Sequence, residues 1–162
     1  MENFKKVLFD LDGVLLDSED RIVRMKNERD DLSWNQFFDT VDWKSLYEEA
    51  LEVNDSLKIL RIYQRLNPDN SFIVSKSHTL EEGRWKLHRI RKEGIVIPMF
   101  IVPPHVKKSD IFIPSSDILL VDDSTKQIGE WRESCGTGYL FDPEDKKEDK
   151  QKVKSLEFLL RR

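Results

Sequence analysis

A short apolar run that ends in two acids constrains this chain more than any other feature. Val7-Leu8-Phe9 leads directly into Asp10-Leu11-Asp12-Gly13. The apolar residues predict a buried β-strand, and the two-residue spacing places Asp10 and Asp12 on the same side of an extended chain. Two carboxylates so close together repel each other unless a cation lies between them. The pair therefore predicts a hard metal ion such as Mg²⁺.

A second apolar run has the same ending. Ile118-Leu119-Leu120-Val121 is followed by Asp122 and Asp123. Buried parallel strands bring their carboxyl ends to one edge of a sheet, which is where open α/β sheets place their functional sites. We therefore expect four acids to share one metal ion: Asp10, Asp12, Asp122 and Asp123.

Strands and helices are expected to alternate along the chain. Further short apolar runs occur at residues 72–75, 98–102 and 139–141, and the segments between the runs are mostly helical in pattern. This alternation predicts an α/β fold with a doubly wound parallel sheet. One helix is expected to begin with a capping box from Thr79 to Glu82 and to end at Gly94.

Four motifs resemble those of the haloacid dehalogenase-like phosphohydrolase superfamily, and they occur in the same order. They are FDLDGVLLDS, the strand that ends in Ser75, a lysine at position 107 or 108, and LLVDDS. The resemblance implies the strand order 3-2-1-4-5 and a single domain, with a core formed by residues 1–16 and 71–162 and a small helical cap insert at about 17–70. The segment EGRWK at residues 82–86 is similar to the 5'(3')-deoxyribonucleotidase branch.

The resemblance also implies roles for the acids. Asp10 would be the nucleophile that forms an aspartyl-phosphate. Asp12 would protonate the leaving oxygen and later take a proton from water, while its backbone carbonyl would contact the metal ion. Asp123 is the preferred direct ligand, with Asp122 acting through water, but the sequence does not determine which of the two has which role. Relatives that cleave carbon–halogen bonds lack the second acid, so Asp12 favours phosphate substrates.

The phosphoryl group needs positive charge and hydrogen-bond donors from the protein. Ser75 is the expected donor at the second motif, where threonine is more usual, and Lys76 and Ser77 are rival donors beside it. Lys107 and Lys108 are two candidates for the compensating cation, and we prefer Lys107. The expected phosphate-binding residues are therefore Ser75, Lys76, Lys107 and Lys108.

Aromatic side chains are dense in the expected cap. Trp34, Phe38 and Trp43 are the candidates for stacking on a substrate ring. The alternative is that they form the core of the cap, because a small helical unit needs bulky residues to hold together.

Composition limits the remaining function classes. A net charge of -4 over 162 residues disfavours long nucleic acid as a partner. The longest apolar stretch, residues 95–102, is interrupted by Pro98 and is too short to cross a membrane, and the few residues before the first strand leave no room for a signal peptide. We therefore expect a cytoplasmic protein with a small phosphorylated substrate.

The predicted function is that of a Mg²⁺-dependent phosphatase for a small phosphomonoester, with a (deoxy)nucleoside monophosphate as the preferred substrate. Two alternatives stay open: a two-metal nuclease, and a catalytically inactive module that binds or regulates. The sequence does not determine the substrate, the oligomeric state or the choice between Lys107 and Lys108.

Overall fold

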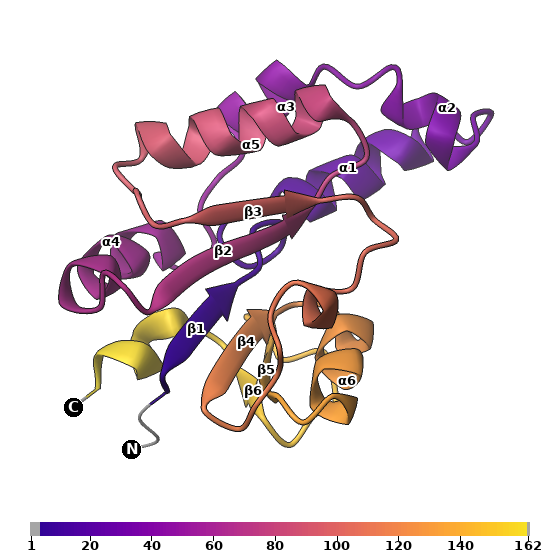
Figure 1. Ribbon diagram of the computed structural model, residues 1–162. Coiled ribbons are helices and arrows are strands. Elements are labelled where there is room, and N and C mark those ends of the chain that lie inside the picture. Colours follow the sequence, from indigo (N-terminus) through magenta and orange to yellow (C-terminus); the bar gives the residue numbers. More distant parts are fainter. Residues whose placement is uncertain (1–3, 162) are drawn as a thin grey trace.

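The centre of the molecule is a parallel β-sheet, and the computed structural model describes residues 4–161 of the chain. Within these residues the sheet has six strands in the order β3-β2-β1-β4-β5-β6, and every neighbouring pair is parallel (Figure 1). The strands are β1 (Lys6–Phe9), β2 (Ser71–Lys76), β3 (Met99–Val102), β4 (Ile118–Asp122), β5 (Thr137–Phe141) and β6 (Lys152–Val153). The predicted order 3-2-1-4-5 is confirmed, and β6 extends it.

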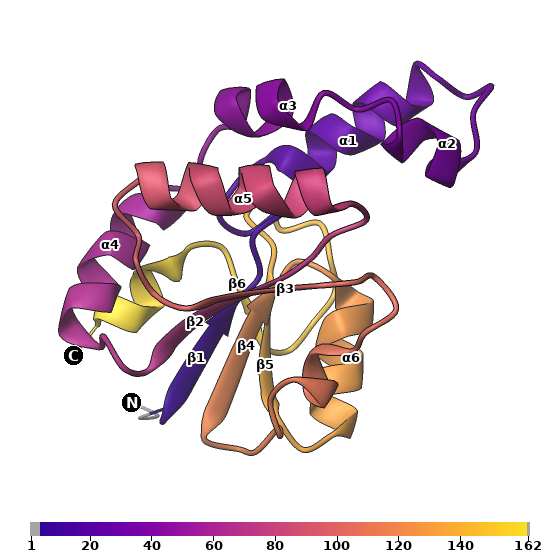
Figure 2. The same cartoon turned by 45° about the horizontal axis from the view of Figure 1, so that its top comes forward.

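Helices cover both faces of the sheet. The α-helices are α1 (Ser18–Asn27), α2 (Trp34–Phe38), α3 (Trp43–Glu49), α4 (Ser56–Leu66), α5 (Leu80–Lys92) and α6 (Thr125–Glu133). Two short 3-10 helices, η1 (Lys108–Asp110) and η2 (Leu156–Leu160), lie in the loop before β4 and at the C-terminal end. Figure 2 shows α4 and α5 on one side of the sheet and α6 on the other. The fold is the doubly wound α/β class expected from the sequence.

The alternation of side chains along β1 explains these two layers. Val7 and Phe9 point into one apolar cluster, which includes Leu60 of α4 and Ile90 of α5. Leu8 points to the opposite face and packs in a second cluster with Ile128 and Trp131 of α6. A strand buried on both faces needs apolar residues at every position, and this requirement accounts for the unbroken apolar run before Asp10.

The helical insert, defined here as α1 to α3, lies at the carboxyl edge of the sheet. In Figures 1 and 2, α1 and α2 extend away from the sheet, and α3 lies beside α5. Arg89 of α5 fixes α3 there, because its guanidinium donates to the carbonyl oxygens of Tyr47 at 2.6 Å and Ala50 at 2.7 Å. These carbonyls belong to the last turn of α3, where no backbone donors remain for them.

Helix α4, in contrast, is part of the sheet's covering layer. Tyr63 of α4 packs edge-on against Phe9 of β1 with ring centroids 6.1 Å apart. The helices that overhang the site therefore end before residue 56, earlier in the chain than the boundary of about 70 expected for the cap insert.

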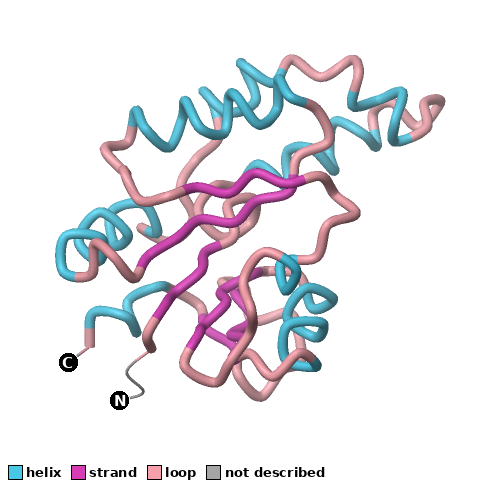
Figure 3. The backbone as a smooth tube through the Cα atoms, viewed as in Figure 1, coloured by secondary structure: helices cyan, strands magenta, loops and turns pink. Residues whose placement is uncertain are grey.

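The loop from β3 to β4 carries η1 toward the same edge of the sheet, as the tube drawing in Figure 3 shows. No helix among residues 4–161 is both long enough and apolar enough to span a bilayer.

Candidate active site

The two acidic strand ends meet as the sheet topology requires. Strands β1 and β4 are neighbours with Phe9 opposite Val121, and the Asp10 amide donates to the Val121 carbonyl at 2.9 Å. Asp10 is the residue after Phe9, and Asp122 is the residue after Val121. The adjacency of the two acids is therefore a direct result of strand pairing.

Three carboxylates form what we call the acidic cluster: Asp10, Asp122 and Asp123. One carboxylate oxygen from each residue lies within 4.8 Å of one oxygen from each of the other two. Lys108 lies between two of them, and its Nζ donates to Asp10 Oδ1 and to Asp122 Oδ2, both at 2.6 Å. Its side chain is only 3 % exposed. Three carboxylates thus face one buried ammonium group, which leaves an excess of negative charge.

The electrostatic cost of this arrangement is visible in the pKa values. Burial raises the pKa of Asp10 well above its ordinary value; Lys108 lowers it in part, and Asp122 raises it further. Burial and the neighbouring Asp122 raise the pKa of Asp123 to about 7. Oxygen donors crowded in this way are the ligand set of a hard divalent cation. The residues present therefore fit the Mg²⁺ ion expected from the sequence.

Gly13 makes room for the acidic cluster. Its φ angle is +83°, and a Cβ atom at this position would lie 2.2 Å from Asp123 Oδ2. Any side chain here would both strain the backbone and displace the Asp123 carboxylate. A glycine is thus required at this position by the acid beside the neighbouring strand.

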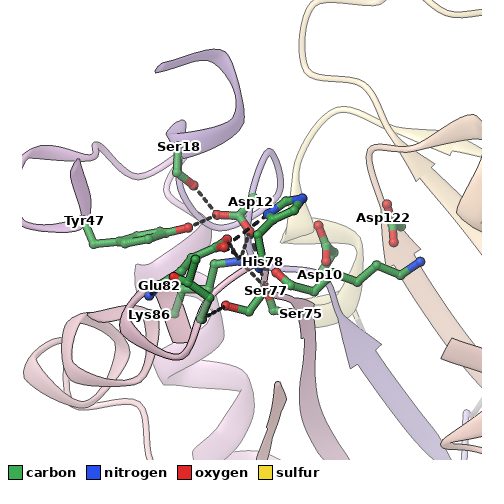
Figure 4. A network of polar contacts seen from close by, with 12 residues as sticks. Asp10, Asp12, Ser18, Tyr47, Ser75, Ser77, His78, Glu82, Lys86 and Asp122 are labelled. Atoms are coloured by element: carbon green, nitrogen blue, oxygen red, sulfur yellow. Dashed lines mark hydrogen bonds and ion pairs between the residues drawn. The ribbon is translucent and has the colours of Figure 1, made fainter. Parts of the chain in front are cut away.

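Asp12 does not join the acidic cluster with its side chain. Figure 4 shows its carboxylate among donors from four different parts of the chain. Oδ1 accepts from Ser18 Oγ at 2.6 Å and from Tyr47 Oη at 2.9 Å. Oδ2 accepts from Lys86 Nζ at 2.7 Å and from Ser75 Oγ at 3.3 Å. The expectation that four carboxylates share one metal ion is corrected to three, because these donors hold the fourth apart.

Two further residues, Glu82 and His78, support this group, and we call Asp12 with its donors and these two residues the Asp12 network. Lys86 Nζ also contacts Glu82 Oε1 at 2.8 Å. Glu82 Oε2 accepts from the His78 amide at 2.6 Å and lies 3.1 Å from His78 Nδ1. The predicted capping box forms only in its Thr79 half, where the Thr79 hydroxyl accepts from the Glu82 amide at 3.0 Å, because the Glu82 carboxylate serves this network instead.

The expected phosphate-binding residues divide between the two groups. Lys108 lies beside Asp10, whereas the Lys107 side chain is exposed, so the geometry favours Lys108 over the preferred Lys107. Lys107 is the residue before η1, and its amide donates to Asp110 Oδ2 at 3.3 Å. Ser75 is buried, and its hydroxyl accepts from Lys86 at 3.2 Å while it donates to Asp12. Lys76 is half-buried and lines the cavity described next.

A cavity of about 710 Å³ opens above both groups and is bounded on one side by the helical insert. Trp34 and Phe38 line it, and Trp34 is 48 % exposed. The Phe38 ring stacks on His78 with centroids 3.7 Å apart. Trp43 does not line the cavity, because it is 3 % exposed and packs between Phe38 and Tyr47 in the insert's own core.

Sequence reasoning missed five members of the Asp12 network: Ser18, Tyr47, His78, Glu82 and Lys86. Ser18 and Tyr47 lie in the segment expected to form the cap insert, and the other three lie at i, i+4 and i+8 on or just before α5, a spacing more typical of an exposed ion-paired helix face. Glu82 and Lys86 differ from such a face in being buried, whereas His78 is exposed.

Comparisons with known proteins identify the fold. No family model matches the sequence, and no curated protein is significantly similar to it. Among solved structures, a HAD-superfamily hydrolase from Ehrlichia chaffeensis matches with a TM-score of 0.62 and 15% identity, over 99% of this chain and 98% of that one. A dehalogenase matches with a TM-score of 0.66 and 14% identity, over 98% of this chain and 96% of that one. A hydrolase from Streptococcus pneumoniae TIGR4 matches with a TM-score of 0.51 and 12% identity, over 86% and 94%. The chain therefore has the haloacid dehalogenase-like fold.

Proposed function

We propose that this protein is a Mg²⁺-dependent phosphatase that hydrolyses a small phosphomonoester through an aspartyl-phosphate on Asp10. One observation carries the proposal: Asp10, Asp122 and Asp123 converge around the buried Lys108 at the carboxyl ends of β1 and β4. A carboxylate nucleophile and a phosphate dianion repel each other, so cationic groups must lie beside them for the attack to occur. In the proposed site Asp10 is the nucleophile, Lys108 is one cation, and the acidic cluster would bind Mg²⁺ as another.

The reaction has two steps in this proposal. An oxygen of Asp10 attacks phosphorus, the bond from phosphorus to the leaving oxygen breaks, and Asp12 gives its proton to that oxygen. Asp12, now a carboxylate, takes a proton from a water molecule that attacks phosphorus; the bond from phosphorus to the Asp10 oxygen breaks, inorganic phosphate leaves, and Asp10 is restored as a carboxylate. Side-chain oxygens of Asp10, Asp122 and Asp123 and the backbone carbonyl of Asp12 would hold Mg²⁺, which when bound supplies positive charge to the phosphoryl oxygens.

Positive side chains around the cavity complete the phosphate site. Lys108 holds Asp10 in place and neutralises part of the charge of the incoming group. Lys76 lines the same cavity, and burial together with Lys108 lowers its pKa. The Ser75 hydroxyl is engaged by Asp12 and Lys86, so its expected contribution to phosphate binding requires it to exchange one of these partners.

The helical insert is the proposed cap, and it supports a nucleoside monophosphate as the substrate. Trp34 and Phe38 present aromatic surface to the cavity that contains Asp10 and Asp12. Such surface suits a nucleobase, because stacking contributes binding energy for any aromatic ring. Trp43 is removed from this part of the proposal by its burial.

Other functions fit the site less well. The structural likeness to a dehalogenase raises carbon–halogen hydrolysis as an alternative, but Asp12 and its donors have no part in that chemistry. A two-metal nuclease is disfavoured by the net charge of -4, and an inactive binding module would have no use for a costly group of repelling carboxylates. We retain the expectation that long nucleic acid is not a partner and that the protein acts in the cytoplasm.

A substrate panel tests the proposal. Phosphate release would be measured from deoxynucleoside monophosphates, sugar phosphates and 4-nitrophenyl phosphate, with and without Mg²⁺, and halide release from 2-chloropropionate would be measured in parallel. We expect phosphate release that requires Mg²⁺. Halide release without phosphate release would contradict the proposal, and so would activity that persists after complete chelation of divalent ions.

A further inference from the structure

Lys86 is a buried lysine with an unusually complete set of acceptors. Its side chain is 1 % exposed, although it belongs to the middle of α5. Its Nζ lies 2.7 Å from Asp12 Oδ2, 2.8 Å from Glu82 Oε1 and 3.2 Å from Ser75 Oγ, and it also donates to the carbonyl oxygen of Lys76. An ammonium group has three N–H donors, so every one of them is used.

The position of this ammonium group is fixed from its own helix. Glu82 lies one turn earlier on α5 and is 2 % exposed, and the amide of His78 holds its other oxygen at 2.6 Å. On the insert side, the ring of Tyr47 covers Lys86, with Nζ 5.8 Å from the ring centroid. Lys86 therefore reaches Asp12 from a rigid helix and has little freedom to move.

Stability alone does not explain such an arrangement. Removing charged groups from water is costly, and apolar residues of similar volume often replace a buried ion pair at no loss of stability. Here the buried charge is directed at Asp12, the residue assigned to proton transfer, while the acidic cluster has its own lysine, Lys108. The presence of one buried lysine in each of the two groups points to separate tasks.

We propose that Lys86, held in place by Glu82, is a positioning residue that orients the Asp12 carboxyl group for proton transfer to the leaving oxygen. This inference rests on the proposed phosphatase function. As the bond from phosphorus to oxygen breaks, its electron pair stays on the leaving oxygen, and the Asp12 proton moves to that oxygen. A carboxylate is left on Asp12, with Lys86, Ser18 and Tyr47 as its hydrogen-bond donors.

The dependence of rate on the leaving group separates this role from a structural one. The alkoxide that leaves benzyl phosphate needs a proton, whereas the 4-nitrophenolate that leaves 4-nitrophenyl phosphate is already a stable anion. The two leaving groups are similar in size. General acid catalysis contributes roughly 10²–10⁴-fold, and Lys86→Met leaves Asp12 itself in place. In this variant kcat/KM for benzyl phosphate should therefore fall by a part of that factor, roughly tenfold to a hundredfold, and kcat/KM for 4-nitrophenyl phosphate should fall less than about threefold. Lys92→Met, the same change at an exposed position of α5, should alter neither value.

A second variant keeps the test decisive if Lys86→Met does not fold. Lys86→Met combined with Glu82→Gln removes one positive and one negative charge, so no unpaired Glu82 carboxylate is buried. The double variant should show the same selective loss for benzyl phosphate. Equal losses on the two esters in a folded variant would overturn the positioning role, since a merely structural defect affects both.

Asp12→Asn distinguishes failure of the inference from failure of the function. It should lose activity on benzyl phosphate at least as selectively as Lys86→Met does. If Asp12→Asn is selective and the Lys86 variants are not, the proposed function stands and the role of Lys86 is refuted. If Asp12→Asn is itself unselective, Asp12 is not the proton donor, and both the mechanism and the inference are overturned.

Discussion

The acidic cluster and the Asp12 network lie side by side but differ in how completely the protein neutralises them. In the cluster, Lys108 donates to two of the three carboxylates, and the pKa values of Asp10 and Asp123 are raised. In the network, the carboxylates of Asp12 and Glu82 share Lys86 and accept further hydrogen bonds from Ser18, Tyr47 and His78. The first group is built to receive a cation from outside, and the second is complete without one.

This difference indicates a division of labour at one sheet edge. Groups that must bind substrate and metal retain unsatisfied charge, which destabilises the fold until the ligand arrives. A group that only transfers protons gains from fixed partners, because its geometry must be the same in every turnover. The predictions below test each side of this comparison separately.

The largest effect is expected in the acidic cluster. Asp10→Asn removes the nucleophile while preserving its shape, so kcat should fall on the order of 10⁴-fold or more. The fold should be retained, because the change also removes one of three repelling charges. Steady-state phosphate release and a thermal melt on the same sample would check both statements. Full activity in folded Asp10→Asn would show that the acidic cluster is not the nucleophilic site.

An effect on stability is expected in the Asp12 network. Burial alone would raise the pKa of Glu82, but hydrogen bonds from His78 and the charge of Lys86 lower it from 4.5 to about 2. Such a shift corresponds to roughly 3 kcal/mol of stability. Because the folded-state pKa is the lower one, this stability is fully present above pH 4.5 and is lost as the pH falls toward 2.

Glu82→Gln tests this contribution of ionised Glu82 to stability. The free energy of unfolding, measured by denaturant titration from pH 6 down to pH 3, should decrease less steeply with acid in the variant than in the parent protein. Glu81→Gln is the matched control, because Glu81 is exposed on the same turn of α5 and lies outside the network. Identical acid dependence in Glu82→Gln and the parent would mean that Glu82 is not held as a charged group.

A smaller effect should distinguish the two groups directly. If the acidic cluster binds Mg²⁺, the ion should stabilise the fold by about 2.7 kcal/mol when its free concentration is about a hundred times its Kd. Thermal melts across a Mg²⁺ titration should show this shift in the parent and in Glu82→Gln, and Asp123→Ala should lose it. A shift of equal size in Asp123→Ala would place the metal site elsewhere.

Much of the fold could be predicted because it depends on local patterns. The apolar runs before Asp10 and Asp122 fix two buried strands, and the requirement that they share a sheet edge fixes their adjacency. Strand β6 could not be predicted in this way, because it has two residues in a highly charged segment and owes its place to pairing with β5.

Within the candidate site, only residues whose position follows from strand pairing, such as Asp10 and Asp122, could be placed from the sequence. Lys107 and Lys108 are neighbours in the sequence, and η1 decides which side chain turns inward. Lys86 has the spacing of an exposed i+4 partner of Glu82, and it becomes a buried group because α3 covers it and Asp12 faces it. Contacts between segments far apart in the chain leave no periodic pattern to read.

The smallest effect concerns the cavity wall above both groups. Trp34 lines the cavity from α2 and is 48 % exposed, so its ring is available for stacking on a substrate base. Trp34→Ala should reduce kcat/KM for deoxynucleoside monophosphates by an amount equivalent to about 1–3 kcal/mol and should change little for glycerol phosphate, which has no ring. Trp85→Ala, at a half-buried tryptophan of α5 outside the cavity lining, is the matched control. The Mg²⁺-dependent shift and the acid dependence of stability should both be unchanged in Trp34→Ala, because this ring is neither in the acidic cluster nor in the Asp12 network. Equal losses on nucleotides and glycerol phosphate would assign Trp34 to packing of the insert, and the nucleotide part of the proposal would then be withdrawn while the phosphatase assignment remains.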